Sequence, residues 1–281
     1  MNTKAEQEIT ALIEQATAGD KGALEAVLAE VQDLVFNLSL RMLGTFHDAE
    51  DASQDILLKV MTHLSSFQGE SAFTTWVFRI AVNHLKDYKK HMFARFPLSF
   101  EFYGDDIRNG KLQDLPDLSQ NVDKAILAEE LKLSCTNVML QCLDAESRCI
   151  FILGTMFRVD SAIAGEILGI TPEAYRQRLS RVRKRMAAFL WEYCGEYGEG
   201  SCRCAARINY AIQNHRLDPA RLDFTSARPG DTAARVTAAM EELDGCSQQF
   251  SFCRTYQSTE RLKQMIREFL NGPAFSTVTN A

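Results

Sequence analysis

The segment from Pro172 to Met186 concentrates side chains that could bind a polyanion. It holds six basic residues and a single acid, Glu173; the basic residues are Arg176, Arg178, Arg181, Arg183, Lys184 and Arg185. Arginine can hold phosphates and can donate to both acceptors on the major-groove edge of guanine. The whole chain of 281 residues carries a net charge of −6, so this segment stands out against an acidic background. Such charge asymmetry favours nucleic acid as its partner.

The residues around this segment predict a helix-turn-helix. A short helix with Ile163, Ile167 and Leu168 ends at Gly169, a residue type suited to a left-handed helix end. Thr171 can cap the next helix and Pro172 fits its first turn. Apolar residues then recur at steps of four and three, namely Tyr175, Leu179, Val182, Met186 and Phe189. Gly165 lies where the two helices must approach closely.

In such a motif the second helix enters the major groove. We expect Arg176, Gln177 and Ser180, early in that helix, to face base edges, and Arg183, Lys184 and Arg185 to contact phosphates. A solvated basic helix packed on a core is the alternative interpretation.

A second basic face is predicted further upstream. Arg79, Asn83, Lys86 and Lys90 recur at four, three and four along a helix expected over 73–90. This face should lie opposite an inward stripe that includes Trp76, Val77, Ile80 and His84. Asparagine offers a donor and an acceptor to a base, although a merely solvated face is the alternative.

The eight cysteines are unevenly distributed along the chain. Cys135, Cys142 and Cys149 lie among apolar residues and are expected in the core. The other five, Cys194, Cys202, Cys204, Cys246 and Cys253, all follow residue 190. The C-x7-C-x-C group of Cys194, Cys202 and Cys204 is a candidate site for zinc, copper or redox chemistry, with His215 nearby. Buried or inert thiols are the alternative, since the spacing is not that of a standard zinc finger.

The pattern of elements predicts an all-α protein with four segments. Residues 5–93 form a first helical domain, with helices over about 24–43, 48–64 and 73–90. Residues 94–121 carry prolines, glycines and acids without a helical stripe and are expected to be a linker. Residues 122–192 form a second helical domain. Residues 193–281 form a mixed, mainly helical extension with helices near 232–243 and 258–270.

Composition and motifs also exclude several classes of protein. Apolar residues are 46% and charged residues 24% of the chain, as in ordinary globular proteins. No apolar run is long enough to span a bilayer, and the N-terminus does not resemble a signal peptide, so a cytoplasmic location without membrane insertion is expected. The sequence lacks a phosphate-binding Gly-rich loop, an H-E-x-x-H and a nucleophile elbow, so we do not expect an enzyme. A thiol redox enzyme would be expected to carry a C-x-x-C motif, which is also missing from the sequence.

Two stretches together resemble the extracytoplasmic-function (ECF) sigma factors of bacteria. Residues 48–90, with the Asp-Ala-Glu-Asp start, Gln54-Asp55, the Phe67-x-Gly69-Glu70-Ser71 loop and the run from Phe73 to Asn83, are similar to region 2 of this family. Residues 131–188, with Leu143-Asp144, Arg148, the run from Glu166 to Ile170 and Arg176-Gln177-Arg178-Leu179, are similar to region 4. The resemblance covers about residues 20–190. Ile163 and Tyr175 depart from the common pattern, which leaves the promoter sequence open.

The resemblance implies a transcription initiation factor that binds core RNA polymerase and promoter DNA. By this resemblance Asp51, Gln54 and Asp55 dock on the polymerase clamp. The helix with Arg79, Asn83, Lys86 and Lys90 opens the minus-ten element, with an unstacked base at Asn83 and Trp76 supporting the helix from within. Arg176, Arg178 and Arg181 bind the minus-thirty-five element. The acidic linker threads toward the polymerase active site.

Three expectations extend or compete with this interpretation. An anti-sigma factor is a further possible partner, and sigma activity requires no cofactor. The cysteine-containing extension is predicted to regulate the sigma factor in cis through a metal or redox site. A stand-alone helix-turn-helix regulator is the competing function, although it would need neither the 48–65 segment nor the Asn83 helix.

Overall fold

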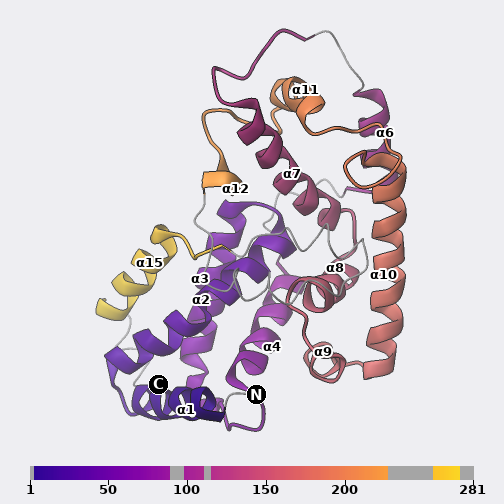
Figure 1. The fold of residues 1–281 in the computed structure, drawn as a ribbon. Helices are drawn as coiled ribbons and strands as arrows, with labels where there is room; N and C mark the ends of the chain where they lie inside the picture. Colours follow the sequence, from indigo (N-terminus) through magenta and orange to yellow (C-terminus); the bar gives the residue numbers. More distant parts are fainter. Residues whose placement is uncertain (1–2, 89–97, 111–114, 227–255, 273–281) are drawn as a thin grey trace.

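The computed structural model describes residues 3–88, 98–110, 115–226 and 256–272, and this part of the chain is all-α (Figure 1). Its secondary structure consists of helices and two isolated β-bridges, Cys194 with Cys202 and Asp218 with Arg221. The N-terminal helices are α1 (Thr3–Thr17), α2 (Lys21–Leu43), α3 (Phe46–Thr62), η1 (Leu64–Ser66) and α4 (Phe73–Lys86). These are followed by α6 (Phe100–Asn109), α7 (Lys124–Gln141), α8 (Ala145–Phe151), the π-helical turn η2 (Ile152–Met156), α9 (Ser161–Leu168) and α10 (Pro172–Tyr193). The extension contributes η3 (Ala205–Arg207), α11 (Ile208–Gln213), α12 (Asp223–Ser226) and α15 (Glu260–Asn271).

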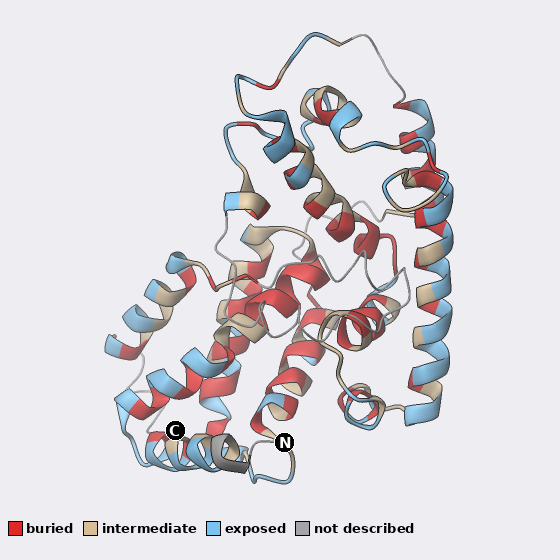
Figure 2. Ribbon diagram, in the orientation of Figure 1, coloured by how far each residue is buried: buried red, intermediate tan, exposed pale blue. Residues whose placement is uncertain are grey.

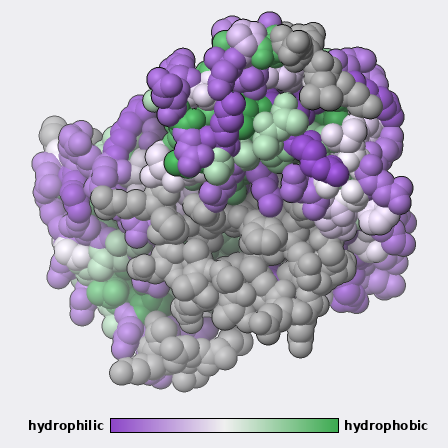
Figure 3. Space-filling view, turned by 45° about the horizontal axis from the view of Figure 1, so that its top comes forward, coloured by the Kyte–Doolittle hydropathy of each residue, from purple (hydrophilic) through white to green (hydrophobic). Residues whose placement is uncertain are grey.

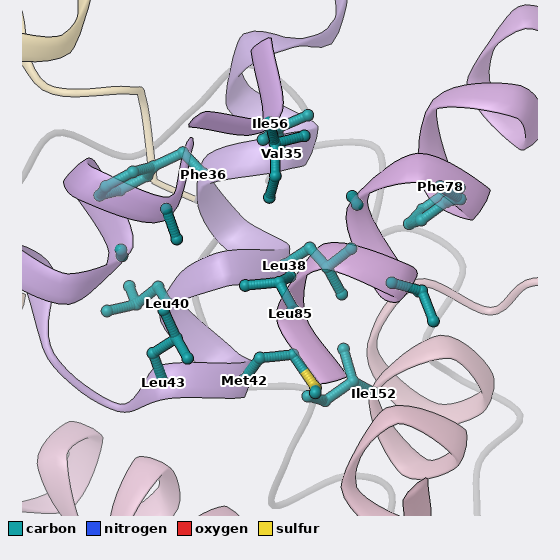
Figure 4. Packing of buried hydrophobic residues seen from close by; sticks show 14 of the residues in the cluster. Val35, Phe36, Leu38, Leu40, Met42, Leu43, Ile56, Phe78, Leu85 and Ile152 are labelled. Carbon is teal, nitrogen blue, oxygen red and sulfur yellow. The ribbon is translucent and has the colours of Figure 1, made fainter. Parts of the chain in front are cut away.

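The central helix α2 begins and ends at residues suited to those positions. The Asp20 carboxylate accepts hydrogen bonds from the backbone N–H groups of Gly22 and Ala23. Gly44, at φ +88°, ends the helix with the left-handed turn that glycine adopts readily. Apolar residues of α2 pack against α3 and α4 in one core, which also includes Ile152 of η2 (Figure 4).

The two predicted helical domains share that core. Buried residues run through the helices on both sides of the linker, as the red segments of Figure 2 show. Buried Arg148 of α8 donates to the backbone oxygens of Leu140 and Leu143, and also to Met42 of α2 at 2.6 Å. Arg41 of α2 donates in turn to Asn137 of α7 at 2.8 Å. On the face drawn in Figure 3, hydrophilic residues predominate over the described surface.

The linker contains a helix, which corrects the expectation of a segment without helical pattern. Ser99 caps α6, and Phe100, Gly104 and Ile107 recur at four and three and are buried. Gly104 indicated a break in the sequence, but here it permits a close approach. A Cβ at this position would lie 2.5 Å from Cζ of Tyr193 on α10. The absence of a side chain therefore lets α6 pack on α10 instead of interrupting it.

The helix-turn-helix has the predicted form. Gly169 ends α9 at φ +69°, and the Thr171 hydroxyl accepts from the backbone N–H of Ala174. A Cβ on Gly165 would lie 2.7 Å from the backbone oxygen of Ile170, so the turn requires a glycine there. Ile163 differs from expectation because it is 38% exposed and points away from the core.

The extension lies against both helical parts of the protein. Helix α15 confirms the predicted helix near 258–270. The predicted helix near 232–243, Cys246 and Cys253 lie outside the described residues. No helix within the described ranges is long and apolar enough to cross a membrane.

Candidate nucleic-acid and polymerase interface

Helix α10 has an inner, apolar face and an outer, polar face. Tyr175, Val182, Met186 and Phe189 are buried, as their spacing predicts. Gln177, Ser180, Arg181 and Lys184 are exposed on the other side. The inner face fixes the helix, and the outer face offers donors that suit base edges and phosphates.

Several arginines of α10 already have partners within the protein. Arg176 donates to the Ser161 hydroxyl at 3.0 Å, and Arg178 forms an ion pair with Glu146 of α8. Both side chains remain exposed, so neither contact removes them from solvent. They are therefore able to exchange these partners for phosphate.

Two basic residues predicted to contact phosphate have a structural role. The Arg183 guanidinium donates to the backbone oxygen of Gly154 at 3.0 Å and to the Thr155 hydroxyl at 3.2 Å. Arg185 lies over the Phe100 ring of α6, with 4.7 Å from its guanidinium carbon to the ring centre. These contacts hold α10 to η2 and to α6.

An open hollow lies beside α4, at the junction with α3. Its volume is about 800 Å³, and it is lined by Trp76, Ile80, Asn83 and His84 together with Lys59 and Tyr88, among others. The prediction that Asn83 faces away from Trp76 and Ile80 is wrong. Asn83 follows Trp76 by seven residues and Ile80 by three, which returns it to the same helical face.

The inward stripe of α4 also differs from the predicted one. Phe73 and Val77 are buried as expected, but Phe78, Ala81 and Leu85 complete the stripe. Trp76, Ile80 and His84 are only partly buried, so Trp76 does not support the helix from within. Its ring instead packs on Phe67 and Phe73, with ring centres 5.6 and 5.8 Å away.

Charges around the hollow perturb two of its titratable groups. Burial and the nearby Lys59 ammonium lower the pKa of His84, while Asp55 opposes this effect. Lys59 Nζ lies 2.8 Å from His84 Nδ1. Burial, assisted by the carboxylates of Asp51, Asp48 and Asp55, raises the pKa of Tyr88 to about 12. At neutral pH the hollow therefore presents a neutral imidazole and a protonated phenol.

The other basic residues predicted on α4 are placed differently from one another. Arg79 forms an ion pair with Glu166 of α9, which joins the two helical parts directly. Lys86, in the last turn of α4, is partly exposed. Lys90 lies outside the described residues.

The predicted polymerase-binding residues lie together on α3. Asp55 is exposed, whereas Asp51 and Gln54 are partly buried. Gln54 lines a small cavity between α3 and α15, and Asp51 lies 3.9 Å from the guanidinium of Arg261. The extension thus reaches the face that the sequence singled out.

The linker acid Asp106 is bound by the extension. Its carboxylate pairs with Arg207 at 3.1 Å and with Arg216, and it accepts from the Tyr210 hydroxyl at 2.7 Å. Burial raises the pKa of this carboxyl, but the hydrogen bonds from Arg216 and Tyr210 and the charges of Arg216 and Arg207 together lower it. Nothing in the sequence spacing joined Asp106 to these partners about 100 residues away.

The three described cysteines of the extension, Cys194, Cys202 and Cys204, are free and partly buried thiols. Cys194 and Cys202 form an isolated β-bridge. Outside the extension, Cys135 of α7 accepts a hydrogen bond from the Tyr103 hydroxyl at 3.0 Å. Burial and the neighbouring thiols raise the pKa of Cys204 to about 11. Among the described residues, no three His, Cys, Asp or Glu side chains are grouped so as to hold a metal ion. Metal or redox chemistry at Cys194, Cys202 and Cys204 stays a prediction.

Comparisons with known proteins find similar sequences among RNA polymerase sigma factors. Residues 27–91 match the family described as Sigma-70 region 2. The ECF RNA polymerase sigma factor SigW of Bacillus subtilis is 27% identical over 179 residues, which cover 62% of this chain and 92% of SigW. The RNA polymerase sigma factor CnrH of Cupriavidus metallidurans is 27% identical over 182 residues, 64% of this chain and 92% of CnrH. A solved structure of CnrH in complex with the cytosolic domain of CnrY aligns with a TM-score of 0.47 and 23% identity, over 64% of this chain and 95% of that one.

These matches define the class of protein as an RNA polymerase sigma factor, which acts in transcription initiation. Within that class several relatives, SigW among them, are named as extracytoplasmic-function sigma factors, and the chain is similar to this group. More than a third of the chain lies outside each of these two sequence alignments.

Proposed function

We propose that three surfaces of this sigma factor carry out promoter recognition and polymerase binding. The outer face of α10 reads the minus-thirty-five element, the hollow beside α4 holds an unstacked base of the minus-ten element, and the acidic face of α3 docks on core polymerase. The division of α10 into a buried face and an exposed face with Gln177, Ser180 and Arg181 carries the proposal.

The hollow beside α4 supports the second part of the proposal. Asn83 offers an amide for hydrogen bonds to a base, and Trp76 offers a ring on which the base can stack. Lys59 offers a positive charge for the phosphate backbone of the DNA strand. Unstacking a base costs a few kcal/mol, which contacts in a pocket offset. His84 and Tyr88 were not expected in this role. The i+4 spacing of Asn83 from Arg79 predicts only a charged face on α4, and gives no sign that aromatic residues lie beside Asn83.

Promoter binding requires the two helical parts to separate. The minus-ten and minus-thirty-five elements are about 25 base pairs apart, or roughly 85 Å at 3.4 Å per base pair. Helix α4 is instead joined to α9 by the ion pair of Arg79 with Glu166, and to Phe157 at the end of η2 by an edge-on contact with Phe78. The described arrangement is therefore a closed form, and Arg79 becomes free for DNA only when it opens.

Transcription with purified core polymerase on promoter fragments tests this proposal. We expect Arg181→Ala to weaken recognition of one minus-thirty-five position by about 1–3 kcal/mol. Lys184→Ala, a matched change further along the same exposed face, should weaken binding about equally on all sequences and lower the salt dependence. Equal loss on all sequences for both variants would remove Arg181 from base recognition.

The minus-ten part has its own test. We expect Asn83→Ala to slow promoter opening, measured by the fluorescence of a base analogue placed in the minus-ten element, while binding to closed duplex promoter is retained. Thr74→Ala, an exposed change on the same helix outside the hollow, serves as the control. An anti-sigma factor as a further partner stays a prediction.

A further inference from the structure

Helix α15 of the extension is strongly amphipathic. Thr259 caps its first turn through its hydroxyl. Leu262 and Leu270 are buried, at 0% and 4% exposed, while Arg261, Arg267 and Glu268 are on the outside. A single apolar face on an isolated helix requires a partner surface, and in Figure 1 α15 lies beside α2 and α3.

The partner surface is the groove between α2 and α3. Met265, Ile266 and Phe269 of α15 meet Leu28 of α2 and Leu57 and Met61 of α3, and the cavity left between them measures only about 10 Å³. Gln54 lines the same contact. The groove is therefore filled closely by this helix.

Ion pairs fix the direction of α15 on this groove. Arg261 Nη1 lies 3.0 Å from Glu50 Oε2, and Arg261 Nη2 lies 3.9 Å from Asp51 Oδ1. Arg267 Nε lies 3.5 Å from Glu25 of α2. Basic residues of the extension thus neutralise acids on the outer side of α2 and α3.

The residues before α15 anchor it to α2. Buried Tyr256 exchanges two backbone hydrogen bonds with the Asn37 side chain, at 2.8 and 2.6 Å. The Ser258 backbone N–H donates to Asp33 at 2.7 Å. The Tyr256 ring also packs edge-on against Phe46, with ring centres 5.5 Å apart. Together these contacts fix the position along α2 at which the segment enters the groove.

We propose that the segment Tyr256–Asn271 occupies the polymerase-docking face of α3 and competes with core RNA polymerase for it. This inference rests on the proposed function, because that function places Asp51 and Gln54 in the docking face. Arg261 lies 3.9 Å from Asp51 and the α15 apolar face lines one cavity with Gln54, so α15 partly covers both residues. Core polymerase then binds only the molecules in which α15 has left the groove. The measured association constant is the intrinsic one multiplied by the fraction of such molecules.

Binding of purified core polymerase to full-length variants tests the competition. We expect Arg261→Glu to bind core roughly threefold to tenfold more tightly than the wild type, because repulsion from Glu50 and Asp51 replaces an ion pair. Lys263→Glu changes the net charge equally on the same helix, but Lys263 pairs with Glu260 of its own helix. This control should bind core as the wild type does.

A second variant and a second readout keep the test decisive. Leu262→Asp places a carboxylate at a fully buried position and forces α15 out of the groove. Amide hydrogen exchange should then accelerate in α15 and in α3, while exchange in α10 stays unchanged. If α15 is released in this variant and core binding does not tighten, the competition is overturned.

The proposed docking face is tested separately from the competition. Gln54→Lys in the Leu262→Asp background should weaken core binding if α3 is the docking face. If Gln54→Lys has this effect while the wild type and Leu262→Asp bind core equally, the docking assignment holds and the inference fails. If Gln54→Lys has no effect on core binding, the docking assignment fails.

Discussion

Helices α3 and α10 present their candidate functional residues in opposite ways. The face of α3 that carries Asp51 and Gln54 is covered by a segment from the end of the chain. The face of α10 that carries Gln177, Ser180 and Arg181 is exposed. The closed form thus leaves the proposed DNA-reading helix exposed and partly covers the proposed polymerase-docking helix. Control in this protein is therefore expected at polymerase binding and at the opening of the two helical parts, and not at access to the outer face of α10.

The largest effect should come from Arg148, which joins α8 to α2 within the shared core. Arg148→Met removes hydrogen bonds to the backbone oxygens of Leu140, Met42, Gln141 and Leu143. We expect a loss of about 3 kcal/mol or more in the free energy of unfolding, because these buried acceptors lose their donor. Urea unfolding measures it.

Arg178→Met is the control for this prediction, because Arg178 forms an exposed ion pair with Glu146. It should cost less than about 1 kcal/mol. Equal losses for the two variants would show that burial of Arg148 is not the stabilising factor. Burial also lowers the pKa of Arg148 to about 10, so the group stays charged at neutral pH.

The next effect should be confined to the covered face. Leu262→Ala is expected to weaken the docking of α15 by about 2–3 kcal/mol, the low end for a buried leucine because the segment lies at the edge of the core. Hydrogen exchange should quicken in residues 256–271 and leave α10 unchanged. Lys263→Ala, which keeps the apolar face intact, should leave exchange in the segment nearly unchanged. Protection lost from α10 as well would mean that the two surfaces are coupled.

A change at the helix-turn-helix should affect the open face alone. Gly165→Ala places a Cβ 2.7 Å from the backbone oxygen of Ile170, and such overpacking costs about 1–3 kcal/mol. DNA binding through α10 should weaken while binding to core polymerase is retained. Ile163→Ala, at an exposed position of the same helix, should change DNA binding little. The prediction is wrong if Gly165→Ala binds DNA as the wild type does.

The smallest effect should appear in the pH dependence of stability. The pKa of His84 is lowered in the folded protein from its usual 6.5, so the unfolded chain binds the proton more readily. The stability contributed by a neutral His84 is complete above about pH 6.5 and is lost as the pH falls toward the lowered folded value. The free energy of unfolding of His84→Gln should therefore change less between pH 7.5 and 5.5 than that of the wild type. His47→Gln, where the ring is 67% exposed, should keep the wild-type dependence.

Prediction from sequence worked best where local spacing and local chemistry agree. The cap at Thr171, the helix ends at Gly44 and Gly169 and the stripe of α10 follow from interactions within a few residues. It failed for α6, because Gly104 was interpreted as a break when its small size serves a contact with Tyr193. It failed again for Trp76 and Asn83, because a helical face was assigned without knowing which side α3 covers.

The sequence by itself determined that this chain is an all-α sigma factor with a helix-turn-helix and a further C-terminal helix. Those features depend on periodicity, capping residues and motif order, which are written along the chain. Only the tertiary structure decided that Arg79 meets Glu166, that Arg207 and Arg216 bind Asp106, and that α15 covers α3. These contacts join residues about 90 to 210 positions apart. No local propensity specifies them, because they arise from which buried surfaces pack together when the chain closes.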